Sequence, residues 1–365
     1  MSAPGVTAPA ELRESIEREL SAHFADRTVA AEAYGQEFRL LWQHAARHAL
    51  GGKLVRPALM VEAYDALAAA TEGTPGERPA RATLISLAAS IELLHYSFLL
   101  HDDVIDGDLT RRGRPNLIGA LLRDRDGTHP EADETALHWA RTGGILMGDL
   151  LLSASHQIFA RAPLAPEIRL RMLDLLDHTI TESVAGEQVD VGLSDGVVSP
   201  DLGTILSMTA HKTATYSFEL PLRAAAILAG ASSAVELALT AAGRHLGLAF
   251  QLQDDLLSTF GDPADHGKDP YSDLREGKQT VILAYARMTS TWPSIEPVLT
   301  TGPLDIAGAA RVAQLLTDCG AEDFARSLVE EQLTALYELL AAAPIPEGVQ
   351  QVLLGFAGRL EGRRT

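Results

Sequence analysis

Apolar residues recur at helical spacing along most of this chain, and convincing alternation of apolar and polar residues with period two is missing. The helical pattern starts near Glu11 and breaks at Gly51 and Gly52, then again in the polar stretches 71–82 and 123–135. It predicts an all-α chain of roughly ten or more helices packed around a central cavity. We expect no sheet.

Each segment with apolar residues at helical spacing is expected to form a helix. The segments are 11–24, 37–50, 56–70, 84 to the first acidic motif, 136–161, 166–189, 203–230, 234–260, 278–289, 308–317, 321–342 and 347–361. The Ala/Pro-rich residues 1–10 are expected to be disordered. Residues 11–365 are expected to form a single all-helical domain.

Two of the apolar helical stretches end in clusters of aspartates. The first, LLHDDVIDGD, carries Asp102 and Asp106 four positions apart, so both carboxylates point to one face of a helix. The second, FQLQDDLL, carries Asp254 and Asp255. Clustered carboxylates repel one another and are disfavoured at the negative end of a helix dipole. Mg²⁺ relieves both problems and commonly shares its ligands with phosphates, so the pattern predicts a site for a magnesium-bound polyphosphate.

Basic residues lie close to the first acidic motif. Arg111 and Arg112 follow it directly, and guanidinium groups bind phosphate oxygens, although an isolated Arg pair is often a solvated charge run. Upstream, Lys53 and Arg56 in GGKLVRP are spaced to converge on one phosphate, but a helix start after glycines explains that segment equally well. His95 lies two turns before the motif on the same helix face. It is either a hydrogen-bond donor to a second diphosphate or an ordinary core histidine.

A second basic set accompanies the second acidic motif. Lys212 has an apolar flank, which favours an inward side chain with a phosphate partner over a surface lysine. Gln251 lies three residues before Asp254 and near its face. Lys268 and Lys278 belong to GKDPYSDLREGKQT, which we expect to be a loop that shields the reacting centre from water.

Composition restricts the partners and the compartment. A formal net charge of −19 makes nucleic acid a poor partner. Cys319 is the single cysteine, so no intrachain disulfide forms, and the opening segment lacks a secretory signal pattern. We therefore expect a cytoplasmic protein. The apolar segment from Leu84 to Leu100 carries Glu92 and His95, which are costly in lipid, so we expect a buried helix and no stable membrane insertion.

In their order and spacing, several segments resemble the trans-isoprenyl diphosphate synthases, the polyprenyl synthetase family, and in particular geranylgeranyl diphosphate synthases. The segments are GGKLVRP, HDDVIDGDLTRRGRP, MGDLLLSA, GEQVD, HKTA, FQLQDD and DLREGK. The resemblance implies an isoprenoid synthase-type bundle around a central catalytic cavity, prenyl diphosphates as small-molecule partners, and a homodimer. It also implies the condensation of isopentenyl diphosphate with an allylic diphosphate, with three Mg²⁺ ions in the substrate-bound enzyme.

The same resemblance assigns roles to residues of this sequence. The metal ligands it implies are Asp102, Asp106 and Asp254, with Asp103 and Asp255 in support. Contacts to the allylic diphosphate are implied for Arg111, Lys212, Thr213, Gln251, Lys268 and Lys278. Isopentenyl diphosphate would be held by Lys53, Arg56, His95 and Arg112. The five aspartates together with Lys212 form the expected catalytic set.

Three positions depart from the family pattern. Ser258 stands where many relatives carry the last Asp of DDxxD, Leu54 where a further Arg is frequent, and Glu187 where Gln is common. The first Asp of the second motif is present. We therefore expect altered metal affinity rather than loss of activity.

The length of the product is expected to depend on the helix that leads to Asp102. Each turn of that helix descends about 5.4 Å, comparable to one isoprene unit. Phe98, four residues back, faces the same side as Asp102, and Ser97, five back, is small. Aromatic residues at these positions restrict the family to short products, so we expect C15–C25 products, with C20 favoured. The alternative for Phe98 is ordinary core packing.

Two other functions fit the same fold. A class I terpene cyclase would ionise a prenyl diphosphate and close rings, but it would not need Lys53, Arg56, His95 and Arg112. A non-catalytic subunit that modulates another prenyl synthase could lose its aspartates, yet all five are present. The sequence favours the synthase.

Overall fold

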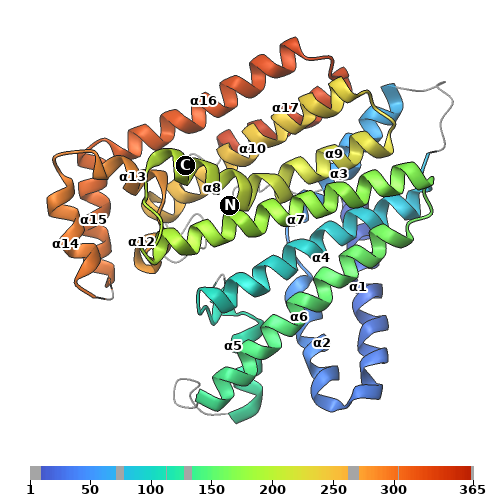
Figure 1. The fold of residues 1–365 in the computed structure, drawn as a ribbon, viewed down its shortest axis with the longest axis horizontal. Helices are drawn as coiled ribbons and strands as arrows, with labels where there is room; N and C mark the ends of the chain where they lie inside the picture. The colour runs from blue at the N-terminus through green and yellow to red at the C-terminus, as the bar shows by residue number, and fades with distance from the viewer. Residues whose placement is uncertain are drawn as a thin grey trace. The chain divides into compact units, whose positions relative to one another are not determined.

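The computed structural model describes residues 10–70, 78–111, 113–126, 134–261, 271–302 and 304–362. These residues are almost entirely helical (Figure 1), which confirms the prediction of an all-α chain with ten or more helices. The chain divides into two compact units. We call Val6–Glu62 with Gly73–Asp174 the N-terminal unit, and Ala63–Glu72 with Leu175–Thr365 the C-terminal unit.

The N-terminal unit is built around two long helices that lie side by side, α4 and α6 (Figure 1). Helix α1 packs on both α2 and α4, and α5 packs on α6. The elements are α1 (Ala10–Ala31), η1 (Glu32–Tyr34), α2 (Gln36–Ala49), the start of α3 (Val55–Ala70), α4 (Arg81–Ile105), β1 (Thr110–Arg111), β2 (Arg114–Pro115), α5 (Leu117–Asp126), α6 (Glu134–Arg161) and the start of α7 (Pro166–Ser194).

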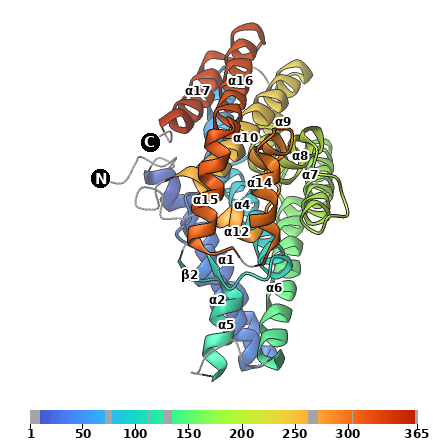
Figure 2. The ribbon, with the colours of Figure 1, turned by 90° about the vertical axis from the view of Figure 1, so that its left-hand side faces the viewer.

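The C-terminal unit is organised around α10, which contacts η3, α9 and α16. Figure 2 shows α14 and α15 next to each other in this unit, and their residues are in contact. Besides the rest of α3 and α7, the elements are α8 (Leu202–Thr209), η3 (Ala210–Glu219), α9 (Leu220–Leu228), α10 (Ser233–Phe260), α12 (Ser272–Glu276), α13 (Val281–Arg287), α14 (Trp292–Thr300), α15 (Ile306–Asp318), α16 (Ala321–Ala342) and α17 (Glu347–Glu361).

Helix α4 carries the first acidic motif and is apolar on nearly every side. Leu84, Leu87 and Leu94 are fully buried, as expected for a helix that lacks a polar face. Each such side chain contributes roughly 1.5–3 kcal/mol when it is removed from water. Among the described helices, α4 is the one long and apolar enough to cross a membrane, but 72% of its most apolar window is buried inside the structure. This agrees with the buried helix that the sequence predicted.

Several local predictions were wrong. The loop expected over 267–280 contains the short helix α12, which begins after left-handed Tyr271 and ends at left-handed Gly277. Helices α5 and α14 were not expected, because both are short and α14 contains an internal proline. A two-stranded ribbon, β1–β2, also forms where no sheet was predicted. The predicted disorder of residues 1–9 lies outside the described residues, whereas Ala10 is already helical.

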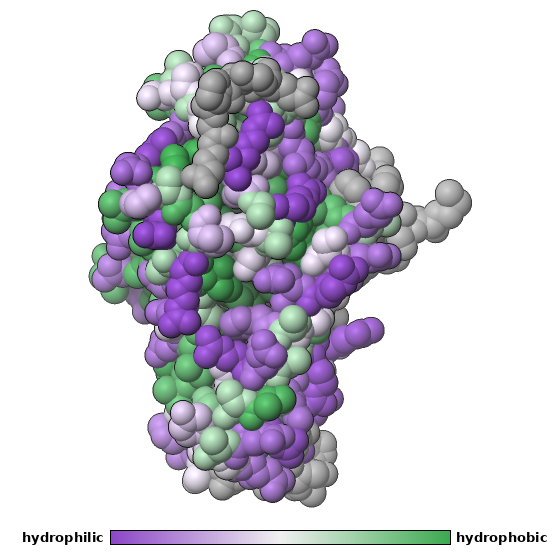
Figure 3. Space-filling model, turned by 90° about the vertical axis from the view of Figure 1, so that its right-hand side faces the viewer, coloured by the Kyte–Doolittle hydropathy of each residue, from purple (hydrophilic) through white to green (hydrophobic). Residues whose placement is uncertain are grey.

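The surface mixes polar and apolar side chains. On the face drawn in Figure 3, hydrophilic and hydrophobic residues are interspersed in small areas. Single exposed apolar side chains are normal on protein surfaces. The exposed apolar residues on α6 are the exception, because Trp139, Ile145 and Leu146 are all 44% exposed or more on one helix.

Candidate active site

The C-terminal end of α4 presents the aspartates of the first motif. Asp106 is exposed at the C-cap, and its backbone N–H donates to the Asp102 carbonyl at 2.8 Å. Gly107 follows in the left-handed conformation, with φ 75°, and the Asp108 N–H donates to the Asp103 carbonyl at 2.8 Å. This is a Schellman-type helix end, in which glycine adopts the left-handed turn without strain. The helix therefore stops directly after the motif.

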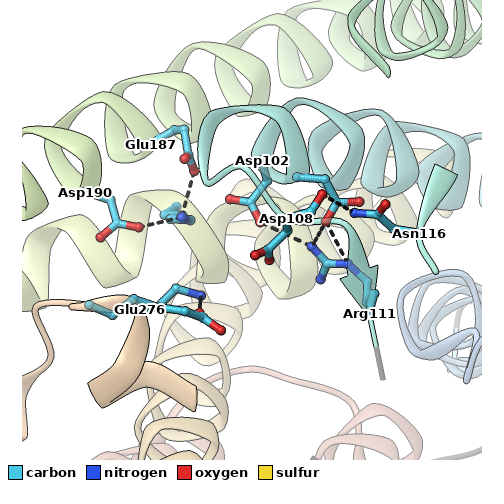
Figure 4. A network of polar contacts seen from close by, with 10 residues as sticks. Asp102, Asp108, Arg111, Asn116, Glu187, Asp190 and Glu276 are labelled. Carbon is cyan, nitrogen blue, oxygen red and sulfur yellow. Dashed lines mark hydrogen bonds and ion pairs between the residues drawn. The ribbon is translucent and has the colours of Figure 1, made fainter. Parts of the chain in front are cut away.

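Asp103 forms an ion pair with Arg111 rather than pointing to solvent. The Arg111 Nη2 lies 2.6 Å from Asp103 Oδ1, and the Nε donates to the same oxygen at 3.2 Å (Figure 4). Arg111 Nη2 also lies 3.5 Å from Asp102 Oδ2. The Asp103 side chain is 3% exposed and that of Arg111 is 37% exposed. The buried aspartate thus orients the arginine while the arginine remains accessible on one side.

The two partners respond differently to burial. Burial raises the pKa of the Asp103 carboxyl, and the neighbouring Arg111 charge only partly offsets that effect. Burial lowers the pKa of the Arg111 guanidinium, but the Asp103 and Asp102 carboxylates raise it by more than burial lowers it. The pKa of Arg111 is therefore above its ordinary value. Arg111 therefore remains a cation at any working pH, as a phosphate-binding group must.

The ribbon that carries Arg111 is fixed by Asn116. The Asn116 Nδ2 donates to the Asp108 carbonyl at 2.7 Å (Figure 4), and its Oδ1 accepts from the Gly119 N–H at 2.9 Å. The second bond caps the start of α5. One buried side chain thus joins the loop after α4 to the next helix. Arg112, the next residue in the sequence, lies outside the described residues.

The segment with Lys53 and Arg56 joins α2 to α3 in the N-terminal unit. Gly51 and Leu54 both have positive φ, 86° and 52°. For a leucine this conformation costs roughly 1–2 kcal/mol, and the Leu54 side chain is only 2% exposed. Lys53 is exposed, while Arg56 and His95 are half-buried. The described members of the predicted isopentenyl diphosphate set therefore all lie in one unit.

Lys212 and Thr213 lie in η3, which is a π-helix. Pro221 follows it at the start of α9. Proline has no N–H and collides with the carbonyl four residues earlier, so an α-helical bond to that carbonyl is impossible. One residue before this proline, the Leu220 N–H donates to the Thr215 carbonyl, five residues back, which is the π-helical pattern. Such wide turns are rare and frequently occur at functional sites.

The Lys212 ammonium is held by two acidic residues of α7. Its Nζ lies 2.5 Å from Asp190 Oδ2 and 2.9 Å from Glu187 Oε2 (Figure 4). Gly186, one residue before Glu187, allows the two helices to approach, because a Cβ there would lie 2.8 Å from the Lys212 Cα. The GEQVD segment therefore supplies both the space for η3 and the counter-charges for its lysine.

The second acidic motif is linked to η3 by hydrogen bonds. Thr213 Oγ1 donates to Gln251 Oε1 at 3.1 Å, and Gln251 Nε2 donates to Asp255 Oδ1 at 2.8 Å. Asp255 is buried and Asp254 is half-buried. Ser258, at the departure from DDxxD, is 3% exposed inside α10. Three predicted residues of this unit are thus brought together, Thr213 of the π-helix with Gln251 and Asp255 of α10, while neighbouring Lys212 pairs with α7.

The remaining predicted residues have separate surroundings. Lys278 Nζ pairs with Glu276 Oε2 at 3.0 Å just after α12 (Figure 4), and Lys268 lies outside the described residues. Phe98 is half-buried on α4. Ser97 is fully buried and donates to the Gly148 carbonyl of α6 at 2.8 Å. Its hydroxyl is therefore directed at α6.

Sequence reasoning missed two contributors to this region. Asp190 was not expected to bind Lys212, although Glu187 and Asp190 are three residues apart and share a helix face. The π-helix was also missed. Its available signal was Pro221, eight positions beyond Thr213 in an otherwise continuous helical pattern.

Comparison with known proteins places this geometry in a family. Residues 40–301 match the model of the polyprenyl synthetase family. The geranylfarnesyl diphosphate synthase of Aeropyrum pernix is 30% identical over 308 residues, which cover 83% of this chain and 87% of that protein. The (2E,6E)-farnesyl diphosphate synthase of Mycobacterium tuberculosis is 31% identical over 305 residues, covering 81% and 75%.

A solved structure extends the likeness over nearly the whole chain. The geranylgeranyl pyrophosphate synthase of Corynebacterium glutamicum, complexed with isoprenyl diphosphate and magnesium, has a TM-score of 0.86 at 27% identity. The match covers 97% of this chain and 99% of that one. With the first aspartate motif at the end of α4 and the second in the last two turns of α10, these matches establish that the chain belongs to the polyprenyl synthetase family.

Proposed function

We propose that this protein is a trans-prenyltransferase that condenses isopentenyl diphosphate with an allylic diphosphate to give a short-chain linear prenyl diphosphate. The observation that carries the proposal is the presence of two basic sets together with both acidic motifs. A single-substrate cyclase needs one diphosphate site, whereas Lys53 and Arg56 supply cations for a second and His95 a ring that can donate a hydrogen bond. Relatives of this family are named as synthases of C15 to C25 prenyl diphosphates.

We assign Mg²⁺ binding to Asp102, Asp106 and Asp254, with three ions in the substrate-bound enzyme. In the described part of the chain, no three His, Cys, Asp or Glu side chains are grouped closely enough to hold a metal ion. Magnesium in phosphate-transfer enzymes is usually held by one or two carboxylates, water and the substrate phosphates, so the donor set fits. The magnesium in the related Corynebacterium glutamicum structure supports this assignment.

The allylic diphosphate is assigned to Arg111, Lys212, Thr213, Gln251, Lys268 and Lys278. Arg111 is oriented by buried Asp103, and Lys212 by Glu187 and Asp190. Groups fixed before substrate arrives need little rearrangement when negative charge develops on the leaving diphosphate. Isopentenyl diphosphate is assigned to Lys53, Arg56, His95 and Arg112, which hold its double bond toward the allylic cation.

The chemistry requires separation of charge and exclusion of water. Bound magnesium supplies Lewis-acid stabilisation of the leaving diphosphate. The residues of this chain bind and align the two substrates, which accounts for much of the rate enhancement in a two-substrate reaction. The allylic C–O bond breaks first and leaves an allylic cation, the double bond of isopentenyl diphosphate then adds to that cation to form the new carbon–carbon bond, and a proton leaves the condensed cation. We propose the departing diphosphate as its acceptor, because the motifs contain no evident side-chain base.

We further propose that residues 11–365 work as one prenyl synthase domain in a cytoplasmic homodimer. The apolar side chains of Trp139, Ile145 and Leu146 on α6 are exposed in the single chain, and a second copy would cover them. Buried α4 and the single cysteine support a cytoplasmic location. Sedimentation of the purified protein tests the dimer, and a monomeric value at micromolar concentration contradicts it.

Product length is proposed to be C15–C25, with C20 favoured and Phe98 as the floor of the chain tunnel beside the smaller Ser97. Purified protein with Mg²⁺ and isopentenyl diphosphate is given dimethylallyl, geranyl or farnesyl diphosphate, and products are identified by mass spectrometry. A linear C20 diphosphate is the expected result. Products of C30 or longer would contradict the assignment of Phe98 as the floor but would still identify a prenyl diphosphate synthase. A hydrocarbon made without isopentenyl diphosphate overturns the proposed function.

A further inference from the structure

Arg13, on the first helix α1, reaches the segment that carries Lys53 and Arg56. Its Nη2 donates a hydrogen bond of 2.9 Å to the carbonyl oxygen of Gly52. The same nitrogen lies 2.8 Å from Glu17 Oε1, one helical turn further along α1. Arg13 therefore joins the N-terminal helix to the backbone of the GGKLVRP segment, 39 positions away.

This backbone needs to be held, because it is strained. Leu54 has a left-handed φ of 52°, a conformation that a non-glycine residue keeps only when its surroundings impose it. The buried Leu54 side chain is one anchor. Its carbonyl accepts from the Ala58 N–H at 3.1 Å, so the strained residue also starts α3.

Gly52 is constrained on both sides. Its carbonyl accepts from Arg13, and a Cβ at this glycine would lie 3.4 Å from Glu92 Oε1 of α4, so the backbone runs close to a buried carboxylate. Lys53 is thus placed between a residue tied to α1 and a residue whose side chain is buried. Its position depends on both.

We propose that Arg13 is a positioning residue for isopentenyl diphosphate, which acts through the Gly52 carbonyl to fix the direction in which Lys53 and Arg56 leave the backbone. This inference rests on the proposed function. The charge of Arg13 is balanced by Glu17, so its effect is transmitted by the hydrogen bond and not by its own contact with a phosphate. Fixing the two cations before binding lowers the ordering cost of capturing the diphosphate.

The test compares steady-state kinetics of the wild type with those of Arg13→Ala, Arg13→Lys and Arg18→Ala. Arg18 is an exposed arginine on the same helix and serves as the matched control. In Arg13→Ala, the KM for isopentenyl diphosphate is expected to rise about tenfold, as for loss of a hydrogen bond from a charged donor. The KM for the allylic substrate and kcat at saturation are expected to change less than about twofold. Arg13→Lys should restore part of the affinity, and Arg18→Ala should match the wild type.

Two outcomes overturn the inference while the proposed function stands. In the first, the active Arg13→Ala enzyme keeps the wild-type KM for isopentenyl diphosphate. In the second, both KM values and kcat worsen together with a lowered melting temperature, which shows a general structural role. If the wild type consumes no isopentenyl diphosphate with any allylic starter, the proposed function fails and this inference fails with it.

Discussion

Arg111 places two of its nitrogens on a single oxygen of Asp103, at 2.6 and 3.2 Å, one residue after Asp102. Neighbouring aspartates of one motif thus have different surroundings. Asp103 is buried against an arginine, whereas Asp102 is 20% exposed. The proposed metal ligand and the residue that orients the phosphate-binding arginine are therefore adjacent in sequence and separable by mutation.

Asp103→Asn is expected to reduce both stability and activity. It removes the charge that faces Arg111, and hydrogen bonds to charged groups contribute roughly 1.5–3 kcal/mol. Because Arg111 is 37% exposed, solvent screening reduces this contribution, and we expect a loss of about 1–2 kcal/mol. Asp102→Asn is the comparison, with activity lost and stability nearly unchanged. Urea unfolding and kcat measurements distinguish the two variants. Equal unfolding midpoints would contradict the different roles assigned to Asp103 and Asp102.

Gly186→Ala is expected to displace Lys212. The added methyl group would lie 2.8 Å from the Lys212 Cα, and overpacking of this kind costs about 1–3 kcal/mol. We expect a lower melting temperature and a raised KM for the allylic substrate. Gly358→Ala in α17 is the control, since a Cβ there meets nothing within 4 Å. The control should be neutral or stabilising by up to about 1 kcal/mol.

Glu219→Gln is expected to change the pH dependence of stability. Burial raises the pKa of the Glu219 carboxyl, an effect that Arg244 opposes and Glu182 reinforces. A carboxyl whose folded pKa is raised costs no stability below its unfolded pKa of about 4.3. Stability then falls as the pH rises from that value through the folded pKa, because the unfolded chain ionises first. The glutamine does not ionise and avoids this loss.

The variant should therefore gain stability relative to the wild type as the pH rises above about 4. Chemical unfolding at several pH values measures the difference. Glu14→Gln, the same substitution at an exposed position on α1, is the control. A constant difference for Glu219→Gln would contradict the prediction.

Phe98→Ala is expected to lengthen the product by at least one isoprene unit, because each turn of α4 corresponds to about 5.4 Å of depth. Phe98→Leu should give an intermediate distribution, and Leu354→Ala, on α17, should leave products unchanged. Mass spectrometry of the products measures all three. An unchanged distribution in Phe98→Ala means that the ring is ordinary core packing.

The sequence predicted the helices that have long apolar faces. Helix α4 is apolar on all sides and α10 has a clear apolar stripe, so both were located to within a few residues. The predictions failed where structure depends on one or two residues. Asn116 caps α5, Pro221 follows the wide turns of η3, and left-handed Tyr271 and Gly277 bound α12. Such local determinants have no periodicity.

The candidate site was also predictable in part, where its geometry follows from a single helix. Motif spacing on one helix predicted the shared face of Asp102 and Asp106, because helical geometry determines it. Contacts between distant segments were not predictable from spacing. Lys212 with Asp190, Thr213 with Gln251, and Arg13 with Gly52 each join residues more than twenty positions apart. Their pairing depends on tertiary packing, which single-sequence patterns do not specify.

The wide turns of η3 also restrict which insertions and deletions this chain can tolerate. Helical residues advance by about 100° each, so removing one residue between Thr213 and Glu219 would rotate Lys212 relative to everything after Pro221. Substitutions at the half-buried positions of this segment, such as His211 and Tyr216, preserve that angle, and a single-codon deletion does not. Among homologues, the number of residues between the GEQVD glycine and the proline of α9 should therefore vary less than the identities of the residues between them.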